Sequence, residues 1–92
     1  MRILDIKVKD PEGLHARPAS RLVILCHRFK SDIIIDFNGI KANGRNITEV
    51  LSLGAEKGDI LSLSINGSDE EKAGPALRKL LEAGAAEAGG QD

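Results

Sequence analysis

A histidine and an arginine stand two residues apart in the segment GLHARPAS, residues 13–20. A neutral imidazole is a nucleophile near neutral pH, so His15 is a candidate to accept a phosphoryl group. Arg17 brings a permanent cation with several donors, which suits phosphate oxygens. The types and spacing of these residues therefore indicate phosphoryl chemistry. A capping or solvent-facing histidine is the alternative that spacing alone leaves open.

The segment around His15 has the pattern of a loop that ends where a helix begins. Gly13 lets the backbone turn and stay close to a ligand, and Pro18 fits the first helical turn, where its missing N–H costs nothing. The N–H groups of that turn, beginning at Ala16, have no intrahelical partner and lie at the positive end of the helix dipole. We therefore expect Gly13, Ala16, Arg17 and Pro18 to hold a phosphate beside His15.

The spacing of apolar residues predicts the elements that position this segment. Alternation with a period of two predicts strands over residues 2–8, 33–37, 40–42 and 60–65. Helical spacing predicts helices over residues 16–29 and 47–53 and a last helix from Ser68, where SDEE reads as a capping box. Pro75 leaves two alternatives, a single kinked helix or a restart with Pro75 in its first turn. We expect fraying past Gly84.

The predicted order is strand, helix, strand, strand, helix, strand, helix. This order favours an α/β fold of the open-faced β-sandwich type, in which three helices cover one face of a four-stranded antiparallel sheet. Asn-Gly at residues 38–39 predicts a tight hairpin between the second and third strands. A chain of 92 residues has room for one core, so we expect a single domain over residues 1–88 and a flexible tail over residues 89–92.

Composition narrows the classes of function. With 13 basic and 14 acidic residues and no Trp or Tyr, the chain has neither the basic field nor the stacking side chains of a nucleic-acid binder. Cys26 is the sole cysteine, which excludes an internal disulfide. The chain shows no signal-peptide pattern and no apolar run of membrane-spanning length, so we expect a cytoplasmic protein. His15 and His27 lack the spacing of a shared metal site, and we expect no metal.

The segment GLHARPAS resembles the active-site signature of HPr, the histidine-containing phosphocarriers of the bacterial phosphoenolpyruvate-dependent phosphotransferase system. The stretches NGIKANGR and LSLGAEKGD are also similar to that family, as is the order of elements. The resemblance implies that His15 is phosphorylated on Nδ1 and that Arg17 stabilises the phosphate. It implies a phosphoryl group taken from phosphorylated enzyme I and passed to a histidine of an enzyme IIA domain. Such a protein is a monomeric carrier without a cofactor rather than an independent catalyst.

Two positions depart from that family or its chemistry. Many members from Gram-positive bacteria have a serine at the position of Asn46, which a dedicated kinase phosphorylates. Asparagine can cap the following helix but has no hydroxyl, so we predict that this regulatory switch is absent and that Thr48 is a poor substitute. Glu12 puts a carboxylate near the proposed phosphate site, where like charges repel, and we expect its side chain to point away.

The remaining surface suggests where partners dock. Arg21 falls near one helical stripe with Arg17 and Arg28, and this positive stripe suits acidic partners. The resemblance places further docking positions in the short helix that follows the hairpin: Ile47, Thr48 and Leu51. The alternative is that the arginine stripe is merely solvated and that Ile47 or Leu51 belongs to the core.

Two other functions remain open from the sequence. The chain could serve a nitrogen-related or other regulatory branch of the same phosphotransferase family, which GLHARPAS does not separate from sugar transport. It could also be an anion-binding module that holds a phosphate or carboxylate without forming a covalent adduct.

Overall fold

The computed structural model of the chain describes residues 1–90. Seven elements follow one another along it: β1 (Arg2–Lys7), α1 (Ala16–His27), β2 (Asp32–Phe37), β3 (Ile40–Asn43), α2 (Ile47–Ser52), β4 (Ile60–Asn66) and α3 (Glu70–Gly90). The strands form one antiparallel sheet in the order β1-β4-β2-β3. The predicted order of elements and the antiparallel sheet are confirmed.

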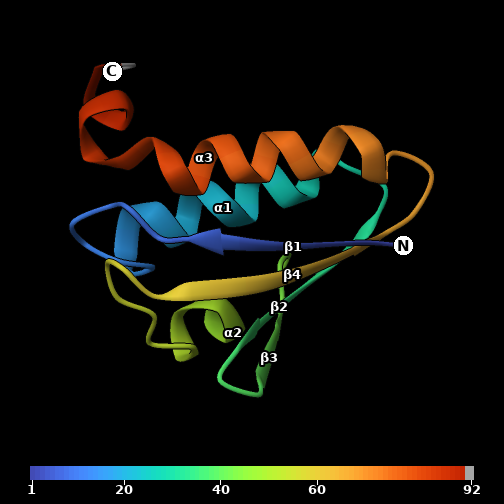
Figure 1. Cartoon of the computed structure of the whole chain (residues 1–92), viewed down its shortest axis with the longest axis horizontal. Helices are drawn as coiled ribbons and strands as arrows, with labels where there is room; N and C mark the ends of the chain where they lie inside the picture. Colours follow the sequence, from blue (N-terminus) through green and yellow to red (C-terminus); the bar gives the residue numbers. More distant parts are fainter. Residues whose placement is uncertain (91–92) are drawn as a thin grey trace.

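The helices pack against one face of the sheet. α1 and α3 contact each other, α3 contacts β1 and β4, and α2 contacts α1 and β3. Figure 1 shows α1 and α3 running side by side along the sheet, with α2 near its β2–β3 side. On the sheet's second face the β1 residues Ile3, Asp5 and Lys7 are exposed rather than covered by these helices, as expected for an open-faced β-sandwich.

The core lies between the sheet and the helices. In β4, Leu61, Leu63 and Ile65 are buried, whereas Ser62 and Ser64 between them are only half-buried. This alternation is the period-two pattern that the sequence predicted for a strand with one buried face. The helices add buried residues from their inner sides: Ala19, Leu22, Cys26, Val50, Ala73, Leu77 and Leu81.

Tight turns set the ends of several elements. Asn38 and Gly39, between β2 and β3, have φ angles of 54° and 83°. Positive φ at both central residues is what a type I′ hairpin requires, so the predicted Asn-Gly turn is confirmed. Gly54, with φ 67°, follows the end of α2 and provides the predicted left-handed stop.

α1 ends two residues earlier than the sequence predicted. The helix stops at His27, and the next N–H groups, those of Arg28 and Phe29, donate to Leu25 and Cys26 in a tightened last turn. Phe29 still packs half-buried against the core, which explains why its spacing fitted a helix. The prediction of a helix to residue 29 was therefore wrong at its C-terminal end.

α3 begins at Glu70, one residue later than a capping box with Ser68 as its N-cap predicts. The residue before the helix is Asp69, whose main-chain carbonyl accepts the Ala73 N–H, so the proposed capping box from Ser68 was wrong. Pro75 lies inside a continuous helix, and the alternative of a restart at that proline is also wrong. Of the predicted tail, residues 89–90 lie within α3 and residues 91–92 lie outside the described part of the chain.

The carboxylate of Asp69 joins the α1–β2 loop to the start of α3. It accepts hydrogen bonds from the Lys30 N–H at 2.8 Å, the Ser31 N–H at 3.0 Å and the Ser31 hydroxyl at 2.6 Å. The bond from the Ser31 hydroxyl, followed by that from Lys30, lowers the pKa of Asp69. Its side chain is therefore committed to this loop rather than to capping α3.

Candidate functional site

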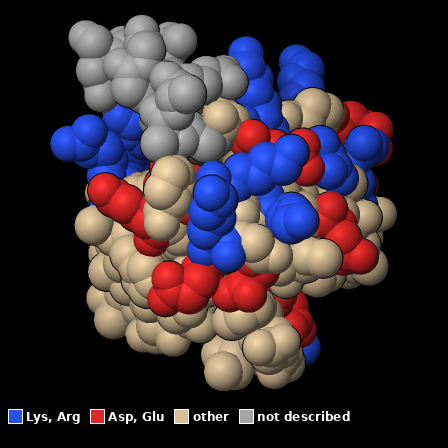
Figure 2. Space-filling view, turned by 60° about the vertical axis from the view of Figure 1, so that its left-hand side comes forward, with Lys and Arg blue, Asp and Glu red and all other residues tan. Residues whose placement is uncertain are grey.

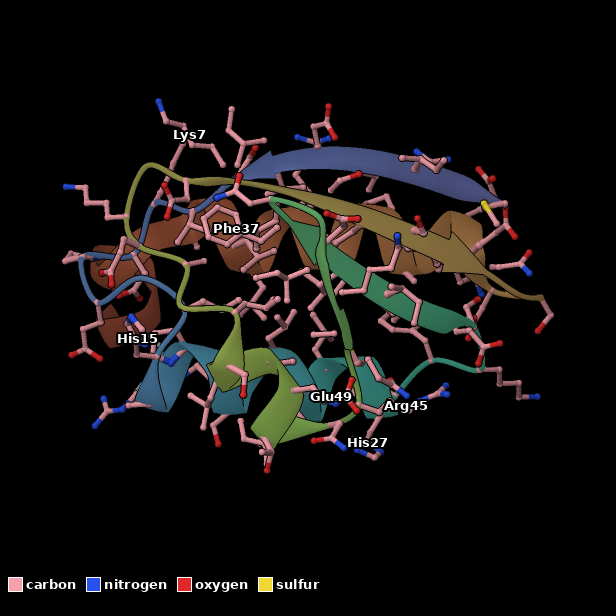
Figure 3. The ribbon with its side chains drawn as sticks, turned by 90° about the horizontal axis from the view of Figure 1, so that it is seen from below. Lys7, His15, His27, Phe37, Arg45 and Glu49 are labelled. Carbon is pink, nitrogen blue, oxygen red and sulfur yellow. The ribbon has the colours of Figure 1, made fainter. Side chains whose placement is uncertain are left out.

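His15 occupies the N-cap position of α1. Its backbone is extended, with φ −116° and ψ 165°, and its side chain makes no capping hydrogen bond to the helix. The side chain is 42% exposed. Figure 3 shows His15 at the end of the molecule where the β1–α1 loop meets the loop between α2 and β4. The imidazole is thus accessible at the positive end of a helix.

Gly13 determines the path of the loop into His15. Its φ is 67°, and a Cβ there would lie 2.6 Å from the carbonyl oxygen of Ala55 and 2.9 Å from Cα of Glu56. The adjoining Leu14 donates its N–H to that same Ala55 oxygen at 2.9 Å. Glycine is therefore required both for its left-handed conformation and for the close approach of the two loops.

A carboxylate contacts the imidazole directly. Nε2 of His15 lies 3.1 Å from Oε2 of Glu56, whose side chain is 68% exposed. Sequence analysis missed Glu56, because it lies 41 residues further along the chain. The carboxylate that it considered, Glu12, is exposed, and its N–H donates to the Asp10 side chain.

Glu56 is held in place by its own turn. Its N–H donates to Oδ2 of Asp59 at 2.7 Å, and the Asp59 N–H donates back to the Glu56 carbonyl at 3.0 Å. The same turn is tied to the end of β1, because Val8 donates to Asp59 at 2.8 Å and accepts from Gly58 at 2.7 Å. The backbone beneath the carboxylate is therefore fixed to the sheet.

The other predicted phosphate-binding residues surround the first turn of α1. Ala16 has φ 41°, an uncommon conformation for a residue with a Cβ. Arg17 is exposed in the same turn. Gly13, Pro18 and Arg21 line one small hollow beside this turn. The structure thus brings the predicted phosphate-binding positions to one end of the molecule.

The predicted partner-binding positions of α2 are exposed. Ile47 is 38% and Leu51 39% exposed, and Thr48 is also exposed, so the alternative that these apolar residues belong to the core is wrong. Asn46 caps α2 as predicted, its side-chain oxygen accepting the Glu49 N–H at 3.1 Å. Because α2 packs against α1, these residues lie on the helix layer that also carries His15.

The second histidine lies at the other end of α1. Nε2 of His27 donates to the carbonyl oxygen of Arg45 at 3.1 Å, and Figure 3 shows this pair far from His15 and close to Glu49. Within residues 1–90, no group of three or more metal-binding side chains comes together. Burial raises the pKa of the Cys26 thiol to about 12, although the Arg45 charge opposes this shift.

The surface at the His15 end carries charges of both signs. Figure 2 turns this end of the molecule forward and shows Lys and Arg side chains gathered over its upper part, with Asp and Glu among and below them. No helix in the described part of the chain is both long and apolar enough to cross a bilayer. An exposed imidazole beside a helix N-terminus fits the class of proteins that hold a small anionic group at their surface.

Comparisons with known proteins agree with this class. Residues 4–83 match the family model "PTS HPr component phosphorylation site". The phosphocarrier protein HPr of Mycoplasma pneumoniae is 36% identical over 83 residues, which cover 89% of this chain and 94% of that protein. The chain therefore belongs to the HPr family, the phosphocarriers of the phosphotransferase system.

Solved structures show the same fold. The crystal structure of HPr-C-His from Thermoanaerobacter tengcongensis superposes with a TM-score of 0.87 at 38% identity, covering 90% of this chain and 93% of that one. That of a phosphocarrier protein HPr from Bacillus anthracis gives a TM-score of 0.85 at 32% identity, covering 88% and 96%. The open-faced β-sandwich is thus the fold of this family.

Proposed function

We propose that His15 is the residue that carries the phosphoryl group, on Nδ1, with Arg17 as the cation that stabilises it. The observation that carries this proposal is the position of His15, exposed and extended at the N-cap of α1 with its side chain unused for capping. Its ring stands beside the first N–H groups of the helix, which attract an anion. Ala16, Pro18 and Gly13 supply the backbone geometry of this phosphate site.

The donor in this proposal is phosphorylated enzyme I, and the acceptor is a histidine of an enzyme IIA domain. The lone pair of Nδ1 forms a bond to phosphorus as the bond between phosphorus and the donor atom breaks, and the donor keeps that electron pair. The second transfer repeats this exchange with His15 as the donor. The site lies open at the surface, which suits a residue that must meet two partners in turn.

Partners dock, in this proposal, on the exposed side of α1 and α2. Arg21 lies one helical turn after Arg17, and the α2 residues Ile47, Thr48 and Leu51 provide a small exposed surface with two apolar members. A positive rim around apolar contacts is a usual composition for a transient interface with an acidic partner. In this proposal the protein works as a monomer in the cytoplasm, where these partners act.

Intact-mass spectrometry tests the proposal. The protein is incubated with phosphoenolpyruvate, magnesium and enzyme I at neutral to alkaline pH, beside His15→Ala. The expected result is the gain of one phosphoryl mass that acid removes and that the variant lacks. No adduct on a folded protein, with enzyme I from the same organism, would overturn the proposal and favour non-covalent anion binding. Transfer onward to a purified enzyme IIA domain tests the second half of the cycle.

A further inference from the structure

The contact between His15 and Glu56 fixes which ring nitrogen carries the hydrogen. Oε2 of Glu56 lies 3.1 Å from Nε2, within hydrogen-bond distance. An ionised carboxylate only accepts hydrogen bonds, so Nε2 must be the donor. In a neutral imidazole the other nitrogen is then unprotonated, and the lone pair of Nδ1 is free to attack phosphorus.

The same contact also places negative charge where the reaction creates positive charge. When Nδ1 forms its bond to phosphorus, the hydrogen on Nε2 remains and the ring becomes a cation. This charge faces Glu56, whereas the phosphoryl group is attached to the other ring nitrogen. A carboxylate on the Nε2 side therefore stabilises the phosphorylated ring without standing at the position of the phosphate.

Three hydrogen bonds hold the backbone around Glu56 before any phosphate arrives. Its turn is closed by Asp59, and the preceding residue, Ala55, accepts the Leu14 N–H next to His15. The absence of a side chain at Gly13 permits this approach, since a Cβ there would lie 2.9 Å from Cα of Glu56. The loop that carries the carboxylate and the loop that carries the imidazole are thus fixed to each other.

We propose that Glu56 is a positioning residue for phosphoryl transfer, which holds Nε2–H of His15 so that Nδ1 is presented and the cationic ring is stabilised. This inference rests on the proposed phosphorylation of His15. It assigns to the α2–β4 loop a role in the chemical step rather than in partner docking. The effect should be modest, because both side chains are partly exposed and solvent screens their interaction.

Rapid-quench measurement of phosphoryl transfer from enzyme I tests this role. We compare Glu56→Ala, Glu56→Gln and Glu12→Gln, the last of which removes a nearby carboxylate charge from the β1–α1 loop and serves as the matched control. In Glu56→Ala the maximal rate constant is expected to fall about fivefold, with the half-saturating concentration of enzyme I unchanged. Glu56→Gln keeps an acceptor but not the charge, so it should recover part of the loss. Glu12→Gln should retain the wild-type rate.

Nitrogen-15 spectra of the imidazole give a second readout that a purely structural role would not change. The unmodified protein should show the Nε2–H form of His15, and Glu56→Ala should admit the Nδ1–H form while its circular dichroism stays native. Three results would overturn the inference. Glu56→Ala could keep the wild-type rate constant, Glu12→Gln could lose as much of it as Glu56→Ala, or Glu56→Ala could change only the half-saturating concentration of enzyme I. Wild-type protein that takes no phosphoryl group would instead refute the proposed function itself.

Discussion

The N–H of Leu14 donates a 2.9 Å hydrogen bond to the carbonyl oxygen of Ala55. Leu14 immediately precedes His15, and Ala55 immediately precedes Glu56. This bond joins the β1–α1 loop to the α2–β4 loop. It is possible because Gly13 leaves room for the Ala55 carbonyl. The site is therefore sensitive to any side chain added at Gly13.

Gly13→Ala is expected to destabilise the fold by about 2 to 4 kcal/mol, the sum of a left-handed alanine and a steric overlap. Gly54→Ala is the matched control, because its φ is also 67° but a Cβ there meets nothing within 4 Å. It should cost only about 1 kcal/mol. Urea unfolding followed by circular dichroism measures both, and equal losses in the two variants would contradict the predicted steric contribution.

Asp69→Asn should weaken the fold at neutral pH and make its stability less dependent on acid. Hydrogen bonding lowers the folded-state pKa of Asp69, so its stabilising effect is present above the ordinary aspartate pKa of about 3.9 and is lost as the pH falls through the folded-state pKa. Urea unfolding at a series of pH values checks this. Asp5→Asn, which removes the carboxylate of an exposed residue of β1, is the control for the loss of one surface charge.

The Cys26 thiol should be unreactive in the folded protein. Burial raises its pKa to about 12, and the thiolate is the reactive form. The folded-state pKa lies above the ordinary thiol pKa of about 8.5. The stability that the protonated thiol contributes is therefore complete below that pH, and it declines as the pH rises toward the folded-state pKa. Labelling with an aromatic disulfide reagent, with and without urea, measures the protection. Rapid labelling without urea would contradict it.

Asn46→Ser should create a substrate for the serine kinase that acts on many HPr proteins, whereas the wild-type protein should accept no phosphate from it. Serine keeps the helix-capping oxygen that Asn46 supplies to the Glu49 N–H and adds the missing hydroxyl. Incorporation of labelled phosphate from ATP checks this prediction. Thr48→Ala is the control, since labelling of the wild type that disappears in this variant would show that Thr48 replaces the family's serine.

Leu51→Glu should weaken the encounter with enzyme I while leaving the chemical step intact. Leu51 is exposed on α2, and a glutamate at this position would place a negative charge against an acidic partner. We expect the half-saturating concentration of enzyme I to rise about tenfold, with an unchanged maximal rate constant. Ile3→Glu, an exposed isoleucine of edge strand β1, is the matched control. A similar rise in both variants would argue against a docking surface on α2.

Much of the fold could be predicted because its signals are local. The Asn-Gly hairpin, the Asn46 cap and the left-handed Gly54 each depend on residues within a few positions of one another. The end of α1 and the start of α3 were misplaced because a distant residue, Asp69, binds the N–H groups of the α1–β2 loop. Such a bond has no counterpart in local spacing.

The residues of the candidate site also fall into two groups, those that a local motif reveals and those that only the fold brings together. His15 and Arg17 could be found because they belong to one short motif, and the helix start beside them is a local property. Glu56 could not, since its contact depends on the fold bringing two loops together from positions 41 residues apart. Sequence analysis considered the carboxylate of Glu12 instead, because Glu12 is close to His15 in the sequence.

Because β1 pairs with β4, the surroundings of His15 are completed late while the chain is being synthesised. A nascent chain already contains the whole GLHARPAS motif long before Ile60–Asn66 has been made, and β1 finds its partner only in that last strand. The turn that carries Glu56 is tied to β1 through Val8, so the loop around His15 gains its neighbour only after β4 has been made. Ribosome-bound intermediates should therefore hold an imidazole that is exposed yet unpaired with the carboxylate.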